Sequence, residues 1–240
     1  MILGVWLVVV GVCDLLRAAR DATSPGRRTL LVVLGTCMLL TAGLLLQLGG
    51  HWWWSVVLPW IAGQAAWLLT SSVALDPSSQ KRGRWRVLAF TSFGLPFAGF
   101  LLAGDALRAP HPALSGTLVG DLGLDRSVLL AGIALLQLST ANLLVRLLLD
   151  AVGVPAQSHE KDLKGGRLLG PMERLFVLVL AVAGQLTAAS VVVAAKGLLR
   201  WPELRSAREG GPSEISEYFL IGSFASWLVA LGGWLVVRTL

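Results

Sequence analysis

The sequence is poor in charged residues, cysteine and histidine, and each shortage excludes a class of protein. Only 14% of its 240 residues are charged, against about 25% in a soluble domain. The two cysteines, Cys13 and Cys37, lie in separate apolar stretches, so no disulfide framework is predicted. The three histidines are far apart in the sequence, so no metal site and no cofactor are predicted.

Hydrophobic residues are abundant instead. They make up 55% of the sequence, and the mean hydropathy is +0.72. A net charge of +6 and ten tryptophans could suggest nucleic acid, but basic loops and interfacial tryptophans are also typical of integral membrane proteins. We therefore expect a membrane protein in contact with membrane lipids, and no nucleic-acid partner.

A membrane-spanning helix needs about 20 mostly apolar residues, and the chain contains seven such runs. They are residues 1–18, 29–48, 52–75, 87–105, 127–150, 173–201 and 217–238. We interpret the first as a retained helix rather than a signal peptide, because no basic residue precedes it. The predicted fold is an all-α polytopic transmembrane bundle of about seven helices, forming one domain over residues 1–240.

Lysine and arginine are concentrated in alternate loops, which predicts the orientation. The basic loops follow the first, third and fifth runs, at 17–28, 81–86 and 161–167. With these loops inside, seven crossings predict an outside N-terminus and an inside C-terminus. The loop after the sixth run disagrees, because its Arg205 and Arg208 would lie outside.

Charged residues at membrane depth are costly and usually face protein or water, so each is a candidate functional residue. Asp14 lies near the inner end of the first run, where a structural ion pair is the favoured interpretation. The fifth run carries Asn142, Arg146 and Asp150 along one helix face. Two interpretations stay open for this face: structural bonds between helices, or a polar pocket shared with Asp14.

The sixth run has the most regular pattern of polar residues. Arg174, Gln185 and Lys196 recur every eleven residues, which places them on one face of a continuous helix, and Arg200 extends this face by one turn. At about 1.5 Å per residue, the run is longer than the hydrocarbon core of a bilayer. The helix is therefore predicted to tilt or to project from the membrane.

Acidic and aromatic side chains flank this face. Glu173 begins the sixth run, and Glu217 and Tyr218 begin the seventh. An antiparallel pair of helices would bring Glu217 close to Lys196 or Arg200.

Small residues recur along the seventh run at spacings of four, four and three. They are Gly222, Ser226, Ala230 and Gly233. Such a stripe lets another helix approach closely, so it predicts a helix-packing surface, within the chain or against a partner.

The C-terminal part resembles a known family. The run "GRLLGPMERLFVLVLAVAGQLTAASVVVAAKGLLRWPELR", followed by "EYFLIGSFASWLVALGGWL", is similar to the C-terminal membrane region of an uncharacterised family of bacterial multi-spanning proteins, classed only as a domain of unknown function. Matching positions include Glu173, Arg174, Gln185, Lys196, Arg200, Glu217, Tyr218, Gly222 and Ser226. The resemblance implies a bacterial plasma-membrane location and supplies no activity.

Three functions stay open. The favoured one is binding or translocation of an anionic lipid head group or small anion along the polar face of the sixth run. The second is a membrane scaffold or assembly subunit with structural ion pairs. The third is an intramembrane enzyme on a lipid or isoprenoid substrate, with Glu173, Glu217 or Asp14 as acid or base. No P-loop, nucleophile elbow, zinc helix or dinucleotide motif is present, which favours a protein that is not an enzyme.

Overall fold

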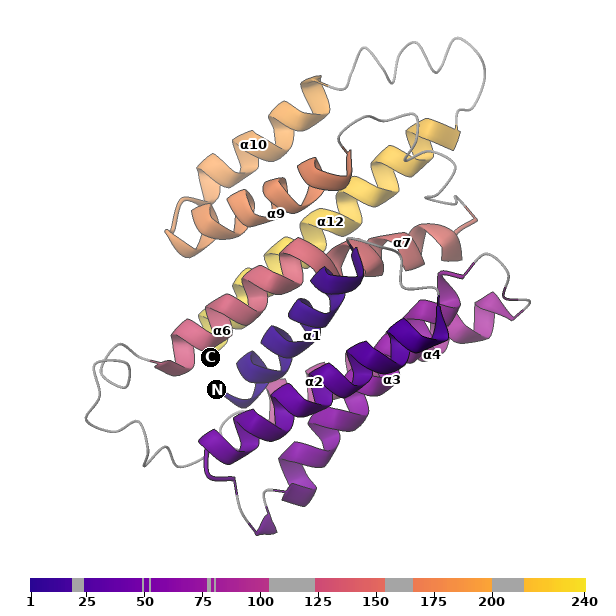
Figure 1. Ribbon diagram of the computed structural model, residues 1–240. Coiled ribbons are helices and arrows are strands. Elements are labelled where there is room, and N and C mark those ends of the chain that lie inside the picture. The colour runs from indigo at the N-terminus through magenta and orange to yellow at the C-terminus, as the bar shows by residue number, and fades with distance from the viewer. Residues whose placement is uncertain are drawn as a thin grey trace. The chain divides into compact units, whose positions relative to one another are not determined.

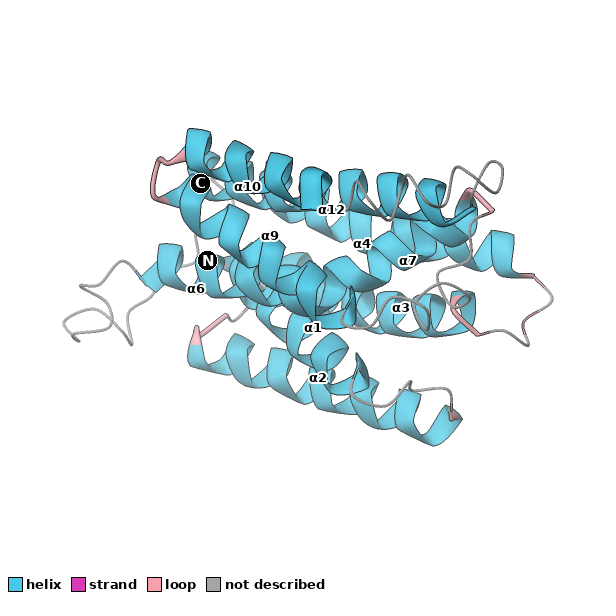
Figure 2. Cartoon of the chain, turned by 90° about the horizontal axis from the view of Figure 1, so that it is seen from above, coloured by secondary structure: helices cyan, strands magenta, loops and turns pink. Residues whose placement is uncertain are grey.

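Every regular element of the described residues is a helix, as the computed structural model shows (Figures 1 and 2). The described residues are 1–18, 24–48, 50–51, 53–76, 79, 81–103, 124–153, 166–199 and 214–240. The α-helices are α1 (Ile2–Ala18), α2 (Pro25–Leu45), α3 (Leu58–Ala74), α4 (Arg82–Leu102), α6 (Leu124–Leu135), α7 (Ala141–Ala151), α9 (Gly166–Val182), α10 (Leu186–Leu199) and α12 (Glu214–Thr239). Two π-helices, η1 (Trp53–Val57) and η2 (Leu136–Thr140), precede α3 and α7. The predicted all-α fold is confirmed.

Within the described residues, five helical stretches are long and apolar enough to cross a membrane. They are Pro25–Leu45, Trp53–Ala74, Arg82–Leu102, Leu124–Ala151 and Phe219–Thr239. α1 and α9 have 17 residues each, the lower limit for a helix that spans a bilayer. These helices place the chain in the class of helical membrane proteins.

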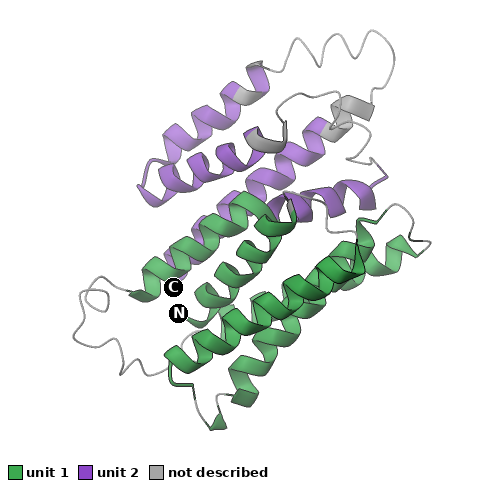
Figure 3. Cartoon of the chain, in the orientation of Figure 1, with its two compact units in different colours: residues 1–140, 240 green, residues 141–239 purple. Residues whose placement is uncertain are grey.

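The chain divides into two compact units, although the sequence predicts one domain. Unit 1 comprises residues 1–140 with residue 240, and unit 2 comprises residues 141–239 (Figure 3). The boundary falls between η2 and α7, inside the helical stretch Leu124–Ala151. An unbroken apolar run gives no sign of such a boundary, which is why the sequence did not reveal it.

In unit 1, α1 packs against α6 and η2 and also contacts α2, α3 and α4. Its Trp6 ring lies 5.5 Å from the Phe93 ring of α4, and Trp6 Nε1 donates a hydrogen bond to the Trp60 carbonyl of α3 at 3.2 Å. Glycines let α1 and α6 approach closely, because a Cβ on Gly132 would lie 2.7 Å from the Gly4 carbonyl oxygen. The core of unit 1 is therefore built around α1.

In unit 2, the predicted sixth helix is wrong as a single element, because the chain reverses within it. α9 ends at Val182, α10 begins at Leu186, and α10 returns alongside α9 (Figure 1). Gly184 has a φ of +77°, which glycine adopts without the steric cost that other residues meet. The Gln185 N–H donates to the Leu180 carbonyl at 2.8 Å and the Gly184 N–H to the Ala181 carbonyl at 3.1 Å. This Schellman arrangement ends α9.

The reversal is held by apolar packing against α12. Val177 of α9, Ala189 of α10 and Ala230 of α12 form one buried cluster. α12 also packs along α9 and α7. The ends of α7 and α10 and the beginnings of α9 and α12 consequently lie at one end of unit 2, with the α9–α10 turn and the end of α12 at the other (Figures 1 and 3).

Candidate functional site

The most deeply buried charges in unit 1 are Asp14 and Arg17, one turn apart on α1. Their side chains are 0% and 5% exposed, and Arg17 Nη2 lies 2.8 Å from Asp14 Oδ1. Burying either charge alone would cost several kcal/mol. The predicted ion pair at Asp14 is therefore present, with the neighbouring Arg17 as the partner.

Side chains of α3 complete this cluster, which we call the Asp14 cluster (Asp14, Arg17, Trp67, Ser71 and Ser72). Trp67 Nε1 donates to Asp14 Oδ2 at 3.0 Å. Arg17 Nη1 donates to the hydroxyls of Ser71 and Ser72 at 2.9 and 3.0 Å, and its guanidinium lies 5.7 Å from the centre of the Trp67 ring. Each charged side chain of α1 therefore has hydrogen bonds to α3, although Arg17 Nε has no hydrogen-bond partner among the described residues.

The sequence analysis missed the α3 residues of this cluster. Trp67 and Ser71 are four positions apart, so they share a helix face, and Gln64 lies on the same face three positions earlier. Gln64 Nε2 contacts Cys13 Sγ at 3.8 Å, and a Cβ on Gly35 of α2 would lie 2.3 Å from that amide nitrogen. A polar face within the apolar run 52–75 was the signal that could have identified these residues.

Arg174 is the buried cation of unit 2, with 2% of its surface exposed. Its Nη1 donates to Ser226 Oγ of α12 at 2.9 Å, and its Nη2 donates to Asn142 Oδ1 of α7. One side chain of α9 therefore joins three helices. We call Arg174, Asn142 and Ser226 the Arg174 clasp.

The prediction that Arg174, Gln185 and Lys196 lie on one face of a single helix is wrong, because the chain reverses between them. Arg174 lies in α9, exposed Gln185 lies in the turn, and Lys196 lies in α10. The eleven-residue spacing aligns side chains only along an uninterrupted helix. Arg200 lies outside the described residues, and the description of Lys196, Glu217 and Tyr218 covers their backbone and not their side chains.

The other predicted residues are partly buried. Glu173 lies beside Arg174 on α9, and Arg146 and Asp150 lie on α7 one and two turns after Asn142. All three take part in polar or electrostatic interactions. Asp14 and Asn142 belong to different units, so the predicted pocket shared by these two residues stays a prediction.

The small-residue stripe of α12 faces other helices of the same unit. A Cβ on Gly222 would be in ordinary contact with Leu149 of α7, at 3.6 Å. Ser226 belongs to the Arg174 clasp, Ala230 to the apolar cluster with α9 and α10, and Gly233 is buried. The stripe therefore serves packing within unit 2, and a partner for it stays a prediction.

Both clusters hold helices together. Asp14 accepts a hydrogen bond from another helix, and Arg17 and Arg174 donate hydrogen bonds to other helices. Among the described residues, no group of three or more His, Cys, Asp or Glu could hold a metal ion. Chemically, the arrangement can fix helix positions at membrane depth, where an unsatisfied polar group is costly.

The fold and these clusters define a helical membrane protein with polar contacts between its helices. Comparison with protein-family models, curated proteins and solved structures yields no match. The resemblance to an uncharacterised bacterial membrane family therefore stays a prediction.

Proposed function

We propose that the chain is a multi-pass membrane protein of the scaffold or assembly type, in a bacterial plasma membrane as the family resemblance implies. The observation that carries this proposal is the Arg174 clasp. Arg174, a buried cation of unit 2, binds neutral groups of two neighbouring helices, so it acts as a structural bond between helices.

The other two functions have less support. Anion binding along the sixth run needs a continuous basic face, and the turn at Gly184 interrupts it. Of the three carboxylates considered for enzyme chemistry, Asp14 has Arg17 against one oxygen and Trp67 against the other, which makes it a poor acid or base. A scaffold needs neither feature, only a rigid bundle with an apolar outer surface.

The reversal also supports a new orientation for the chain. Because α10 returns to the end of unit 2 where α9 begins, we propose that the basic residues that precede α9 in the sequence and those that follow α10 belong to the same side of the membrane. The exception at Arg205 and Arg208 to the positive-inside rule is then removed. In this arrangement the end of α12, with Arg238, lies outside, on the same side as the beginning of α1.

Two arms test the scaffold proposal. In proteoliposomes with a chloride or phosphate gradient, we expect no flux above that of empty liposomes. In cells, a photo-crosslinking amino acid at Leu95, which is 72% exposed on α4, should give a discrete adduct with one protein partner. The matched control is Phe93 on the same helix, which is 8% exposed and should give none.

Two results would overturn the proposal. One is an anion flux that Arg174→Met abolishes, because this assigns the clasp to a transport route. The other is crosslinking from Leu95 to lipid alone, because a scaffold must contact a protein.

A further inference from the structure

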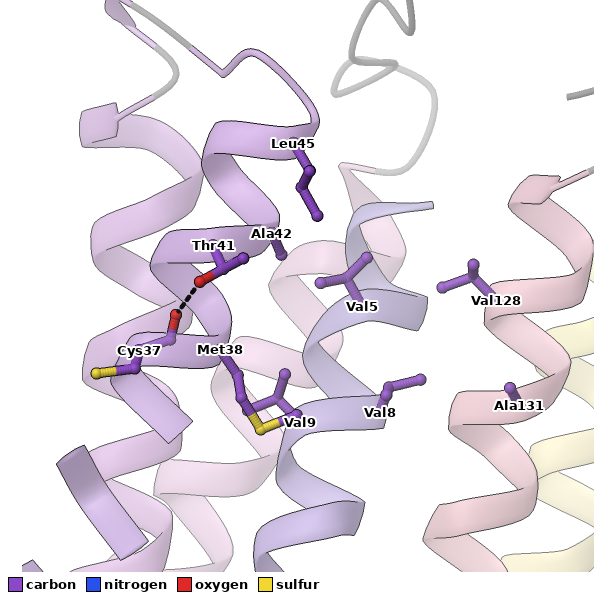
Figure 4. Close-up of a pocket in the computed structure, with 10 residues that line it drawn as sticks. All are labelled: Val5, Val8, Val9, Cys37, Met38, Thr41, Ala42, Leu45, Val128 and Ala131. Atoms are coloured by element: carbon purple, nitrogen blue, oxygen red, sulfur yellow. Dashed lines mark hydrogen bonds between the residues drawn. The ribbon is translucent and has the colours of Figure 1, made fainter. Parts of the chain in front are cut away.

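An apolar groove runs between α1, α2 and α6 in unit 1 (Figure 4). Its volume is about 500 Å³, and its lining is Val5, Val8, Val9, Cys37, Met38, Thr41, Ala42, Leu45, Val128 and Ala131. None of these residues is charged, and the Thr41 hydroxyl already donates to the Cys37 carbonyl at 2.8 Å. The groove therefore offers an almost purely hydrocarbon surface.

α1 and α2 are in contact beyond the Cys37 end of the groove. There, Cys13 Sγ lies 3.8 Å from the Leu31 carbonyl oxygen, and a Cβ on Gly35 would lie 3.1 Å from the same sulfur. Val128 and Ala131 of α6 form the third wall of the groove (Figure 4).

Its position along α2 matches one leaflet of a bilayer. The α2 wall begins at Cys37, near the middle of the helix, and ends at Leu45, the last residue of the helix. At about 1.5 Å per residue these eight steps cover about 12 Å, close to half of the ~30 Å hydrocarbon core. This half lies away from Arg28, which pairs with Asp76 at the opposite end.

We infer that this groove binds one hydrocarbon chain of a membrane lipid from the leaflet opposite the basic loops. Its volume is within the range of about 300–1,000 Å³ found for ligand sites. Leu45 and Ala131 are exposed on its walls, so the groove is open to the surrounding lipid. Because no charge lines it, recognition depends on the chain and is independent of the head group.

The test uses the full chain in liposomes with phosphatidylcholine that carries a diazirine near the middle of one acyl chain. After illumination, adducts mapped by mass spectrometry should concentrate on the groove residues of α1 and α6. Ala131→Phe, which places a ring at the exposed wall, should remove these adducts. The matched control is Ala98→Phe, at an exposed alanine of α4, which should leave them unchanged.

A second variant and a second lipid complete the experiment. Ala42→Phe, on the α2 wall, should remove the same adducts, and phosphatidylglycerol with the same chain should label as strongly as phosphatidylcholine. The inference fails if adducts spread evenly over the exposed leucines of α4, if both groove variants keep them, or if only the anionic lipid labels. A photo-crosslinking amino acid in place of Val8 that gives protein–protein adducts would overturn it as well, because such adducts assign the groove to a helix of another chain.

Discussion

Asp14 and Arg17 show how a membrane helix can carry two charges without an aqueous route beside them. They are one turn apart, so the pair forms within α1 and needs no other element for neutrality. α3 then supplies an indole N–H and two hydroxyls. Each member of the pair therefore has its own hydrogen bonds to α3, and the ion pair within α1 keeps both charges neutralised.

Removing one charge should destabilise the protein much more than removing both. Asp14→Asn or Arg17→Met leaves a buried, uncompensated group and should cost about 3–5 kcal/mol. The double variant Asp14→Leu/Arg17→Met should cost less than either single change, because no charge remains buried. Reversible unfolding in detergent, analysed as a double-mutant cycle, measures this coupling.

The pair Arg28–Asp76 is the control for this cycle. Its side chains are 16% and 24% exposed, with Arg28 Nη2 3.1 Å from Asp76 Oδ2. Water reaches such a pair, so Asp76→Asn should cost only about 1 kcal/mol. Equal losses for Asp14→Asn and Asp76→Asn would contradict the structural role given to the Asp14 cluster.

At the scale of elements, the turn at Gly184 decides how unit 2 is built. It converts one long apolar run into the antiparallel helices α9 and α10, and it brings Ala189 against Val177 and Ala230. Without the reversal, Arg174 could still meet Asn142 and Ser226, but α10 would have no place in the cluster.

The same substitution at two glycines should have opposite effects. Gly184→Ala places a Cβ at a positive φ and should lower stability by about 1 kcal/mol. Gly197→Ala adds a methyl group inside α10, with nothing within 4 Å, and should raise stability by up to about 1 kcal/mol. Thermal denaturation in detergent measures both, and a stabilising Gly184→Ala would contradict the reversal.

The sequence predicts elements well where one physical requirement dominates. α2 and α4 overlap most of the apolar runs 29–48 and 87–105, although each begins four or five residues earlier, because span length and hydropathy are properties of the run itself. The turn at Gly184 is harder to predict, because a single glycine costs a helix only about 1 kcal/mol and apolar residues continue on both sides. The excess length of the run 173–201 was the available signal, and it is equally consistent with tilt.

The candidate sites also differ in how far they could be predicted: contacts within one helix are predictable, and contacts between helices are not. The Asp14–Arg17 pair is local, so the sequence indicates an ion pair there. Trp67, Ser71 and Ser72 join it only through the packing of α3 on α1, which no spacing in the sequence specifies. Arg174 and Asn142 were each identified as polar residues at membrane depth, but their contact depends on how α9, α7 and α12 pack.

For the whole molecule, the hairpin changes the count of membrane passages and hence the side of the C-terminus. A continuous sixth helix predicts seven crossings and an inside C-terminus. A reversal at Gly184 gives an even number of passages whether α9 and α10 cross fully or enter the membrane from one side and return. The basic segments before α9 and after α10 then share a side.

The side of the C-terminus is the most direct test. The full chain is fused after Leu240 either to alkaline phosphatase, which is active outside the bacterial plasma membrane, or to green fluorescent protein, which fluoresces inside. The hairpin predicts an active phosphatase fusion and a dark fluorescent fusion. A fluorescent fusion with inactive phosphatase would contradict the hairpin and restore the seven-helix arrangement.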